Sequence, residues 1–164
     1  MSRVEDKVNG YIVKHSELFL TRLKQYAEGR IASSTTRAQR DIFKKLAEID
    51  QTIQLGGNVP VQGPRSSRLD LYYKSPKTAT AFVVELKVEP VGFRGIAQAA
   101  YYNACLRHDH DFVILLAPDK GPDFDEFIAK CIKRSAWSRV LFIKTIDIGL
   151  RLSHGTKHAS FTNK

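Results

Sequence analysis

Three ionisable side chains lie inside two apolar segments of this chain. Asp70 lies in Arg68-Leu-Asp70-Leu-Tyr-Tyr73, and Glu85 and Lys87 lie two residues apart in Phe82-Val-Val-Glu85-Leu-Lys87-Val88. Burying such charges costs free energy unless they are paired, solvated or bound to a cation. Two carboxylates suit a hard divalent metal, which can activate a water against a phosphodiester. The residue types therefore predict metal-dependent hydrolysis of a phosphodiester bond.

The two segments are predicted to form a hairpin of strands 67–74 and 79–88 around the turn 75–78. Residues two apart in a strand share a face, so Glu85 and Lys87 project together. A connecting loop with an even number of residues places Asp70 on their face, whereas an odd loop without a bulge places it on the other. Loops 75–78 and 76–77 both have the even parity that the site requires.

On one face, the two carboxylates would repel each other unless a cation neutralised them. Mg²⁺ prefers oxygen ligands, so we expect Asp70, Glu85, the backbone carbonyl of Leu86 and a substrate phosphate oxygen to bind it, with Mn²⁺ able to substitute. Lys87 is expected to orient or help deprotonate the water, or to neutralise the transition state. The alternative is a salt-bridge ladder of Glu85 and Lys87 with Arg68 and Asp70 on an exposed sheet face.

The remaining pattern predicts helices on both sides of this hairpin. Residues 1–52 are helical in pattern, with good N-cap residues in the polar joint 33–36. Residues 54–64 are a loop with room for one short strand. The elements predicted after the hairpin are a helix at 94–107, a strand at 112–117, a helix at 123–134, a strand at 140–145 and a further candidate strand at 148–152.

A hairpin requires antiparallel pairing, while a strand–helix–strand segment favours a parallel crossover. The predicted fold class is therefore α/β, with a mixed four- to five-stranded sheet flanked by helices. We expect one domain, divided into a helical N-terminal part (1–52), a core (65–150) and a loose tail (155–164).

Composition limits the classes of partner. Among 164 residues, 26 are basic and 17 acidic, giving a net charge of +9 that favours a polyanionic partner. The apolar runs have strand length, far short of a membrane span, and the charged start has no apolar signal segment, so we expect a cytoplasmic protein with no membrane partner. Cys105 and Cys131 are too few for a four-cysteine metal site and are expected to be buried thiols.

The order Asp70, hairpin, Glu85-Leu-Lys87 and then a helix with Gly95-Ile-Ala-Gln98-Ala-Ala-Tyr-Tyr102 resembles the PD-(D/E)xK nuclease superfamily. The Gln-x-x-x-Tyr element is similar to the RecB-like and Holliday-junction-resolvase-like branches. The resemblance covers about residues 65–150 and implies a restriction-endonuclease-like core with a four-stranded mixed sheet.

The resemblance implies that Asp70 and Glu85 bind metal, that Lys87 serves the catalytic step, and that Gln98 and Tyr102 line the site. This chain departs from the family pattern in having Leu69, where the motif has proline. The family also often has an acidic residue on its first core helix, for which Glu48 is our candidate, with Asp41 and Glu17 as rivals.

We therefore expect a Mg²⁺-dependent DNA endonuclease in DNA processing, recombination, repair or restriction, and a homodimer if both strands are cut. The alternatives are a nucleic-acid-binding module on the same scaffold without turnover, and a protein-interaction domain. Basic residues around the centre are expected to contact phosphates, although each is equally consistent with a solvated surface charge: Arg65, Arg68, Lys74, Lys77 and Arg94.

Overall fold

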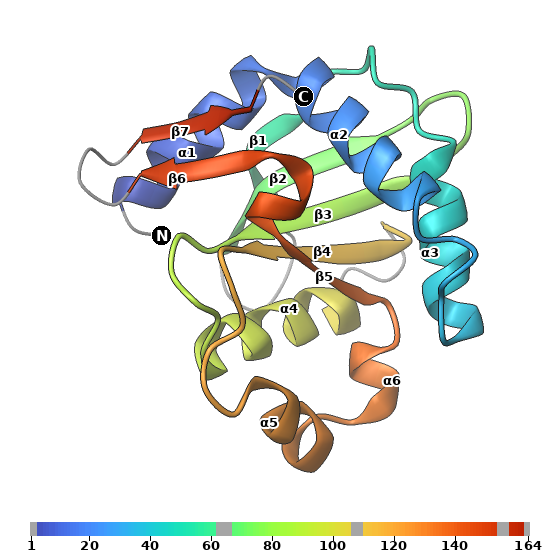
Figure 1. The fold of residues 1–164 in the computed structure, drawn as a ribbon, viewed down its shortest axis with the longest axis vertical. Helices are drawn as coiled ribbons and strands as arrows, with labels where there is room; N and C mark the ends of the chain where they lie inside the picture. The colour runs from blue at the N-terminus through green and yellow to red at the C-terminus, as the bar shows by residue number, and fades with distance from the viewer. Residues whose placement is uncertain (1–2, 62–66, 106–109, 154–157, 163–164) are drawn as a thin grey trace.

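The computed structural model describes residues 3–61, 67–105, 110–153 and 158–162, which form a mixed sheet with helices on both faces (Figure 1). The helices are α1 (Arg3–Lys14), α2 (Ser16–Glu28), α3 (Arg37–Ala47), α4 (Phe93–Cys105), α5 (Phe124–Cys131), α6 (Arg134–Trp137) and the short 3-10 helix η1 (Thr145–Ile148). The strands are β1 (Gly56–Val61), β2 (Ser67–Lys74), β3 (Ala81–Leu86), β4 (Phe112–Ala117), β5 (Val140–Lys144), β6 (Leu150–Ser153) and β7 (His158–Phe161).

The main sheet has the strand order β1-β2-β3-β4-β5. Strands β1, β2 and β3 are antiparallel neighbours, whereas β3, β4 and β5 run parallel. The parallel strands are connected through α4 and then through α5 and α6, as strand–helix–strand crossovers require. The predicted α/β class and the mixed sheet flanked by helices are confirmed.

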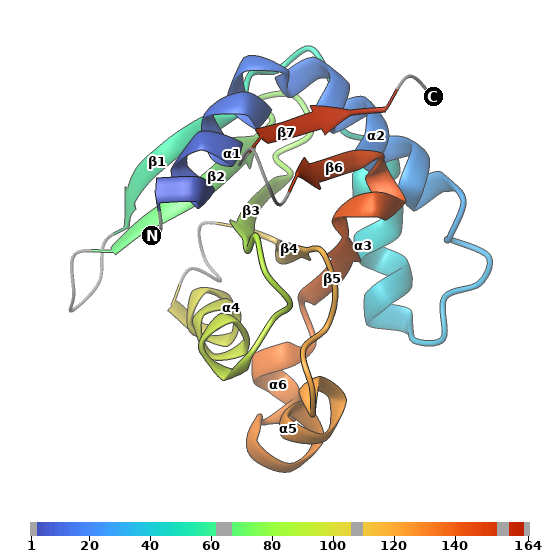
Figure 2. The same ribbon diagram turned by 60° about the vertical axis from the view of Figure 1, so that its left-hand side comes forward.

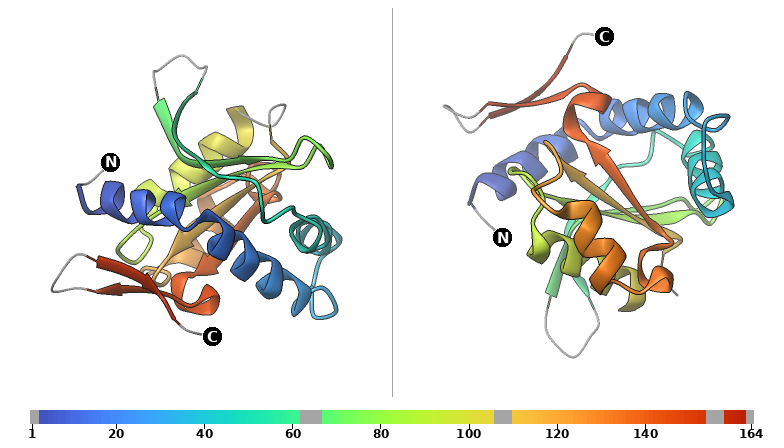
Figure 3. Two further views of the ribbon diagram at one scale, coloured as in Figure 1. Left: turned by 90° about the horizontal axis from the view of Figure 1, so that it is seen from above. Right: turned by 60° about the horizontal axis from the view of Figure 1, so that its bottom comes forward.

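Each face of the sheet is covered by its own set of helices (Figures 2 and 3). Phe82, Val84 and Leu86 of β3 point into the core formed with α1, α2 and α3. Val83 points to the other face, toward Ile96 of α4. All six residues of β4 are buried, as its continuous apolar run predicts for a strand covered on both sides.

Local signals in the sequence explain which element boundaries were predictable. Strands β2 and β4 have the predicted bounds, and Thr36 caps α3 by accepting a hydrogen bond from the backbone N–H of Gln39 at 3.1 Å. Strand β3 is shorter than predicted, because Ala79 has a φ of 57° and interrupts the extended backbone. The helix predicted over 123–134 is divided into α5 and α6, because Ile132 is extended.

The prediction of a loose tail over residues 155–164 is wrong for residues 158–161. Residues 158–161 form β7, which pairs with β6 in antiparallel register. Phe161 lies against the rings of Tyr11 and Phe19, with ring centroids 5.7 and 6.4 Å apart, and its backbone N–H donates to the Tyr11 hydroxyl at 3.0 Å. The contacts that order this strand come from α1 and α2, which no local pattern near residue 160 could indicate.

Within the described ranges, no helix combines the length and the apolar character needed to cross a membrane.

Cys131 is an exposed free thiol, so the prediction of a buried thiol is wrong for this residue. The side chain of Cys105 lies outside the described part of the chain.

Gly149 provides a test of the way the β6–β7 hairpin is held. It has a φ of 71°, and a Cβ there would collide with the Arg22 guanidinium, which donates to the Thr162 carbonyl. Gly149→Ala should therefore lower the free energy of unfolding by at least about 1–2 kcal/mol, measured by urea unfolding. Gly10→Ala is the control, because its Cβ would meet nothing within 4 Å and alanine is favoured in the helix. Equal stability of the two variants would contradict this account of the hairpin.

Candidate metal centre

The pairing register of β2 and β3 brings the two predicted carboxylates together. Leu71 pairs with Val84 and Lys74 with Ala81, so the next position along this register places Asp70 opposite Glu85. The connection is the six-residue segment 75–80, longer than either predicted loop but also even. The backbone N–H of Ser75 donates to the carbonyl of Thr80 at 2.9 Å and so extends the ladder into that segment.

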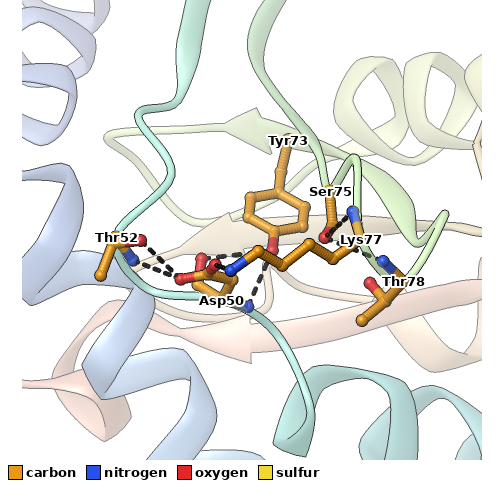
Figure 4. A network of polar contacts seen from close by, with 6 residues as sticks. All are labelled: Asp50, Thr52, Tyr73, Ser75, Lys77 and Thr78. Carbon is orange, nitrogen blue, oxygen red and sulfur yellow. Dashed lines mark hydrogen bonds and ion pairs between the residues drawn. The ribbon is translucent and has the colours of Figure 1, made fainter.

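A polar network at the tip of the hairpin fixes this connection (Figure 4). The Ser75 hydroxyl accepts hydrogen bonds from the backbone N–H groups of Lys77 and Thr78, at 3.3 and 3.2 Å. The Tyr73 hydroxyl accepts from the backbone N–H of Asp50 at 2.9 Å. Lys77 forms an ion pair with Asp50 at 3.8 Å. Because a slip of one residue would break these contacts, the turn helps to set the register.

Both carboxylates are buried on the face of the sheet that α4 covers. Asp70 is 3% exposed and Glu85 is 1% exposed. Asp70 Oδ2 accepts a hydrogen bond from the backbone N–H of Leu86 at 2.9 Å. Glu85 Oε1 lies 3.1 Å from Lys87 Nζ, whereas Glu85 Oε2 is buried with no hydrogen-bond donor among the described residues. An exposed salt-bridge ladder, the alternative from the sequence, is inconsistent with this burial.

A line of polar contacts connects the carboxylates to α4. Lys87 Nζ donates to Gln98 Oε1 at 3.0 Å, and Gln98 Nε2 donates to the Tyr102 hydroxyl at 3.0 Å. Gln98 and Tyr102 share a helix face because they are four residues apart. The structure therefore brings together five of the residues that the sequence singled out: Asp70, Glu85, Lys87, Gln98 and Tyr102.

The start of α4 packs closely on Val91, beside Lys87, because residue 95 is glycine. A Cβ at Gly95 would lie 2.9 Å from Val91 Cγ1 and 3.5 Å from Lys87 Cε. Any side chain there would force Val91 to move, whereas the contact with the lysine would be an ordinary van der Waals contact. Gly95 therefore allows the start of the helix that carries Gln98 to pack closely on Val91, beside the lysine.

The electrostatics of the centre disfavour two ionised carboxylates without a cation. Burial, and then the charge of Asp70, raise the pKa of Glu85 to about 8, although Lys87 opposes the shift. Burial also raises the pKa of Asp70, against the Leu86 N–H and Lys87. Burial and the charge of Glu85 raise the pKa of Tyr102 to about 12. One ammonium group faces two carboxylates, so bound positive charge would stabilise the pair.

These groups fit a hard divalent cation. Asp70 and Glu85 supply carboxylate oxygens, one of them without a donor, and Leu86 places its backbone beside Asp70. In the part of the chain that the structure describes, no three His, Cys, Asp or Glu side chains converge as a ready metal cluster. The rest of a coordination shell would therefore come from the Leu86 carbonyl, waters and the substrate.

Glu5 is a helix carboxylate whose charge reaches the centre. The sequence interpretation did not single it out. The charge of Glu5 in the first turn of α1 helps to raise the pKa of Asp70. Glu48 is the exposed C-cap of α3, its rivals Asp41 and Glu17 are also exposed, and none of the three is among the charges that shift the pKa of Asp70 or Glu85. The sequence signal that could have indicated Glu5 is the pair of acidic residues in the first turn of the first helix.

The predicted phosphate contacts do not all surround the centre. Arg94 is exposed in the first turn of α4, next to Gly95 and therefore near Lys87. Lys74 and Lys77 lie toward the turn of the hairpin, at the end away from the Asp70–Glu85 pair. Two further predicted residues cannot be placed, since Arg65 and the side chain of Arg68 are outside the described part.

Glu85 makes the stability of the metal-free protein depend on pH. Its pKa is raised from 4.5 to about 8 on folding, so the folded state binds more protons in that interval. The free energy of unfolding should therefore fall as pH rises from 4.5 to 8, by roughly 2–4 kcal/mol. Glu85→Gln should flatten this slope and exceed the wild type in stability at pH 8. Chemical unfolding across this pH range tests it, with exposed Glu48→Gln expected to keep the wild-type slope.

Glu5 should contribute to cation affinity through its charge. Removing that charge in Glu5→Gln should weaken Mn²⁺ binding by roughly three- to tenfold, as expected for a nearby unit charge at high effective dielectric constant. Titration calorimetry of Glu5→Gln beside Glu48→Gln tests this, because the second variant should bind as the wild type does. A loss of affinity in Glu48→Gln alone would restore the sequence-based candidate.

Comparison with known proteins yielded no relative. No protein-family model matches the chain, and neither a curated protein nor a solved structure matches it. The function proposed for the centre therefore depends on the geometry and chemistry of this chain's own residues.

Proposed function

We propose that this chain is a Mg²⁺-dependent deoxyribonuclease of the PD-(D/E)xK type that cuts DNA internally. The observation that carries the proposal is the buried Asp70–Glu85 pair, in which Glu85 Oε2 has no donor among the described residues. Lys87 lies beside it, held by Glu85 and Gln98. The strand order, antiparallel from β1 to β3 and parallel from β3 to β5, is also consistent with the restriction-endonuclease-like core that the resemblance implies.

Asp70, Glu85 and the carbonyl of Leu86 are the residues that would hold magnesium. When bound, magnesium would acidify a water and offset negative charge on the phosphate. Mn²⁺ has similar ligand preferences and should replace it.

The side chains beside the carboxylates have separate roles. Lys87 presents an ammonium group beside Glu85, where it would orient the attacking water and stabilise the charge that develops on the phosphate. Gln98 contacts Lys87 Nζ and acts as a positioning residue. The Tyr102 hydroxyl accepts a hydrogen bond from the amide of Gln98, and its raised pKa of about 12 keeps this hydroxyl protonated at neutral pH.

DNA is the substrate that the charge of the chain favours. The net charge of +9 attracts a polyanion over long range. Arg94, exposed at the start of α4, is the described basic residue best placed to contact a phosphate near the centre. A single centre cuts one strand at a time, so cutting both strands of a duplex would need two copies of the chain.

Cleavage of supercoiled plasmid in Mg²⁺ or Mn²⁺ tests this function. Asp70→Ala and Glu85→Ala should each lower the nicking rate at least 1000-fold, because each removes a ligand of the cation. Lys87→Ala should lower turnover by roughly 10²–10³ while DNA binding is retained. Asp125→Ala is the matched control, because it removes an exposed carboxylate that forms a surface ion pair with Lys120 and should leave the rate unchanged.

Two results would overturn the proposal. Salt-sensitive DNA binding by the wild type without cleavage in either metal would favour a nucleic-acid-binding module without turnover. Absence of any DNA binding at low salt would favour a protein-interaction domain.

A further inference from the structure

A basic pocket lies at the C-terminal end of α4, away from the carboxylates. It has a volume of about 590 Å³, and Asn103 of α4, Lys133, Ser135 of α6, Ser138 and Arg139 are among the residues that line it. Figure 1 shows α6 beside this end of α4, whereas the segment from β3 enters α4 at the other end. The pocket is therefore separate from the candidate metal centre.

No described residue balances the charges in this pocket. Lys133 and Arg139 form no ion pair with a described residue, and no carboxylate is among the described residues that line the pocket. Neighbouring Lys130 differs, because Glu126 pairs with it at 2.6 Å. Two cations at one concave surface attract an anion, and bringing one between them would lower their mutual repulsion.

The backbone that carries these side chains is anchored on two sides. Asn103 is 5% exposed and donates from Nδ2 to the carbonyls of Ser135 and Ala136, at 3.4 and 2.9 Å. The carbonyl of Arg139 accepts from the backbone N–H of Val113 in β4 at 2.9 Å. The pocket wall is therefore fixed to both α4 and the sheet before any ligand binds, which reduces the entropy lost on binding.

The polar groups that remain suit a phosphate. Lys133 and Arg139 supply ammonium and guanidinium donors, and the exposed hydroxyl of Ser135 can donate to a further oxygen, whereas the Ser138 hydroxyl donates to the Ser135 carbonyl at 3.2 Å. Hydroxyls and basic side chains of this kind make most contacts to the DNA backbone, and they carry no base specificity.

The pocket and the candidate metal centre lie at different places along α4. Gln98 and Asn103 are five residues apart on α4, a rise of about 7.5 Å, and they point to different flanks of the helix. Successive phosphates of one strand are separated by about 3.4 Å along the duplex axis. The pocket and Lys87 would therefore contact different phosphates of the DNA.

We propose that this pocket binds a phosphate of the DNA backbone other than the phosphate at the bond that is cut. The identity of the polyanion depends on the proposed function, whereas the preference for phosphate depends on the pocket alone. Binding there adds affinity and fixes the position of the DNA on α4 without contributing to the chemical step.

The test removes both cations in Lys133→Ala/Arg139→Ala and measures DNA binding over a range of salt concentrations without divalent metal. The dissociation constant should rise roughly 10- to 100-fold at low salt, and the slope of log K against log salt should shrink by about 0.9, the amount expected when one phosphate is no longer neutralised. The matched control is Arg37→Ala/Lys44→Ala, which removes two exposed basic residues of α3 on the far side of the sheet. Equal effects of the two double variants would overturn the proposal.

Two further measurements separate a specific site from a general loss of charge. The defect should appear with a 16-nucleotide strand and vanish with a dinucleotide that cannot span both places, while Lys133→Arg/Arg139→Lys should restore binding. Amide NMR shifts at Ser135 and Ser138 should move with the long strand at far lower concentration than with inorganic phosphate. Shifts that respond equally to both would mean that the pocket binds free phosphate and not the DNA backbone, and would overturn the proposal.

These outcomes are distinct from failure of the proposed function. A wild-type chain that binds DNA through Lys133 and Arg139 but never cuts it would remove the nuclease proposal and retain the phosphate site. A chain that cuts DNA with the same KM and kcat when both residues are alanine would retain the nuclease proposal and remove the phosphate site. Circular dichroism and the melting temperature of each variant show that the fold is intact.

Discussion

The pairing register between β2 and β3 is the constraint on which the centre depends. With Lys74 opposite Ala81, Asp70 faces Glu85 on the side of the sheet that α4 covers. A shift of one residue would turn Asp70 toward the apolar core of α1, α2 and α3 and leave its charge without a partner. The hydrogen bonds of Ser75 at the hairpin tip therefore help to determine the geometry of a centre at the other end of the strands.

Burial and charge imbalance distinguish this centre from an ordinary ion pair. Lys87 is the one ammonium group in contact with Glu85 among the described residues, while Asp70 and Glu5 add negative potential. A surface pair loses little when a partner is removed, but two buried carboxylates with one cation store repulsion that a divalent ion can relieve. Folding thus leaves an excess of negative charge at the candidate metal centre and an excess of positive charge in the pocket of Lys133 and Arg139.

The sequence predicted those parts of the structure that depend on local pattern. Strand β4 follows from an uninterrupted apolar run, the start of α3 from Thr36, and the shared face of Asp70 and Glu85 from alternation and an even loop. Contacts between distant segments were not predictable. Glu5, for example, acts on a residue 65 positions later only because α1 packs on β2. The C-terminal strand and the basic pocket were missed for the same reason.

The packing of β7 on α1 has a consequence for the order in which the protein is made. Strand β7 leaves the ribosome after every other described element, yet its Phe161 supports Tyr11 in the first helix. Until translation reaches this strand, α1 lacks part of its packing, and the acidic side chain at its start is held less firmly beside the centre. In a nascent chain, the electrostatic environment of the centre would therefore be completed only after residues 158–161 have emerged.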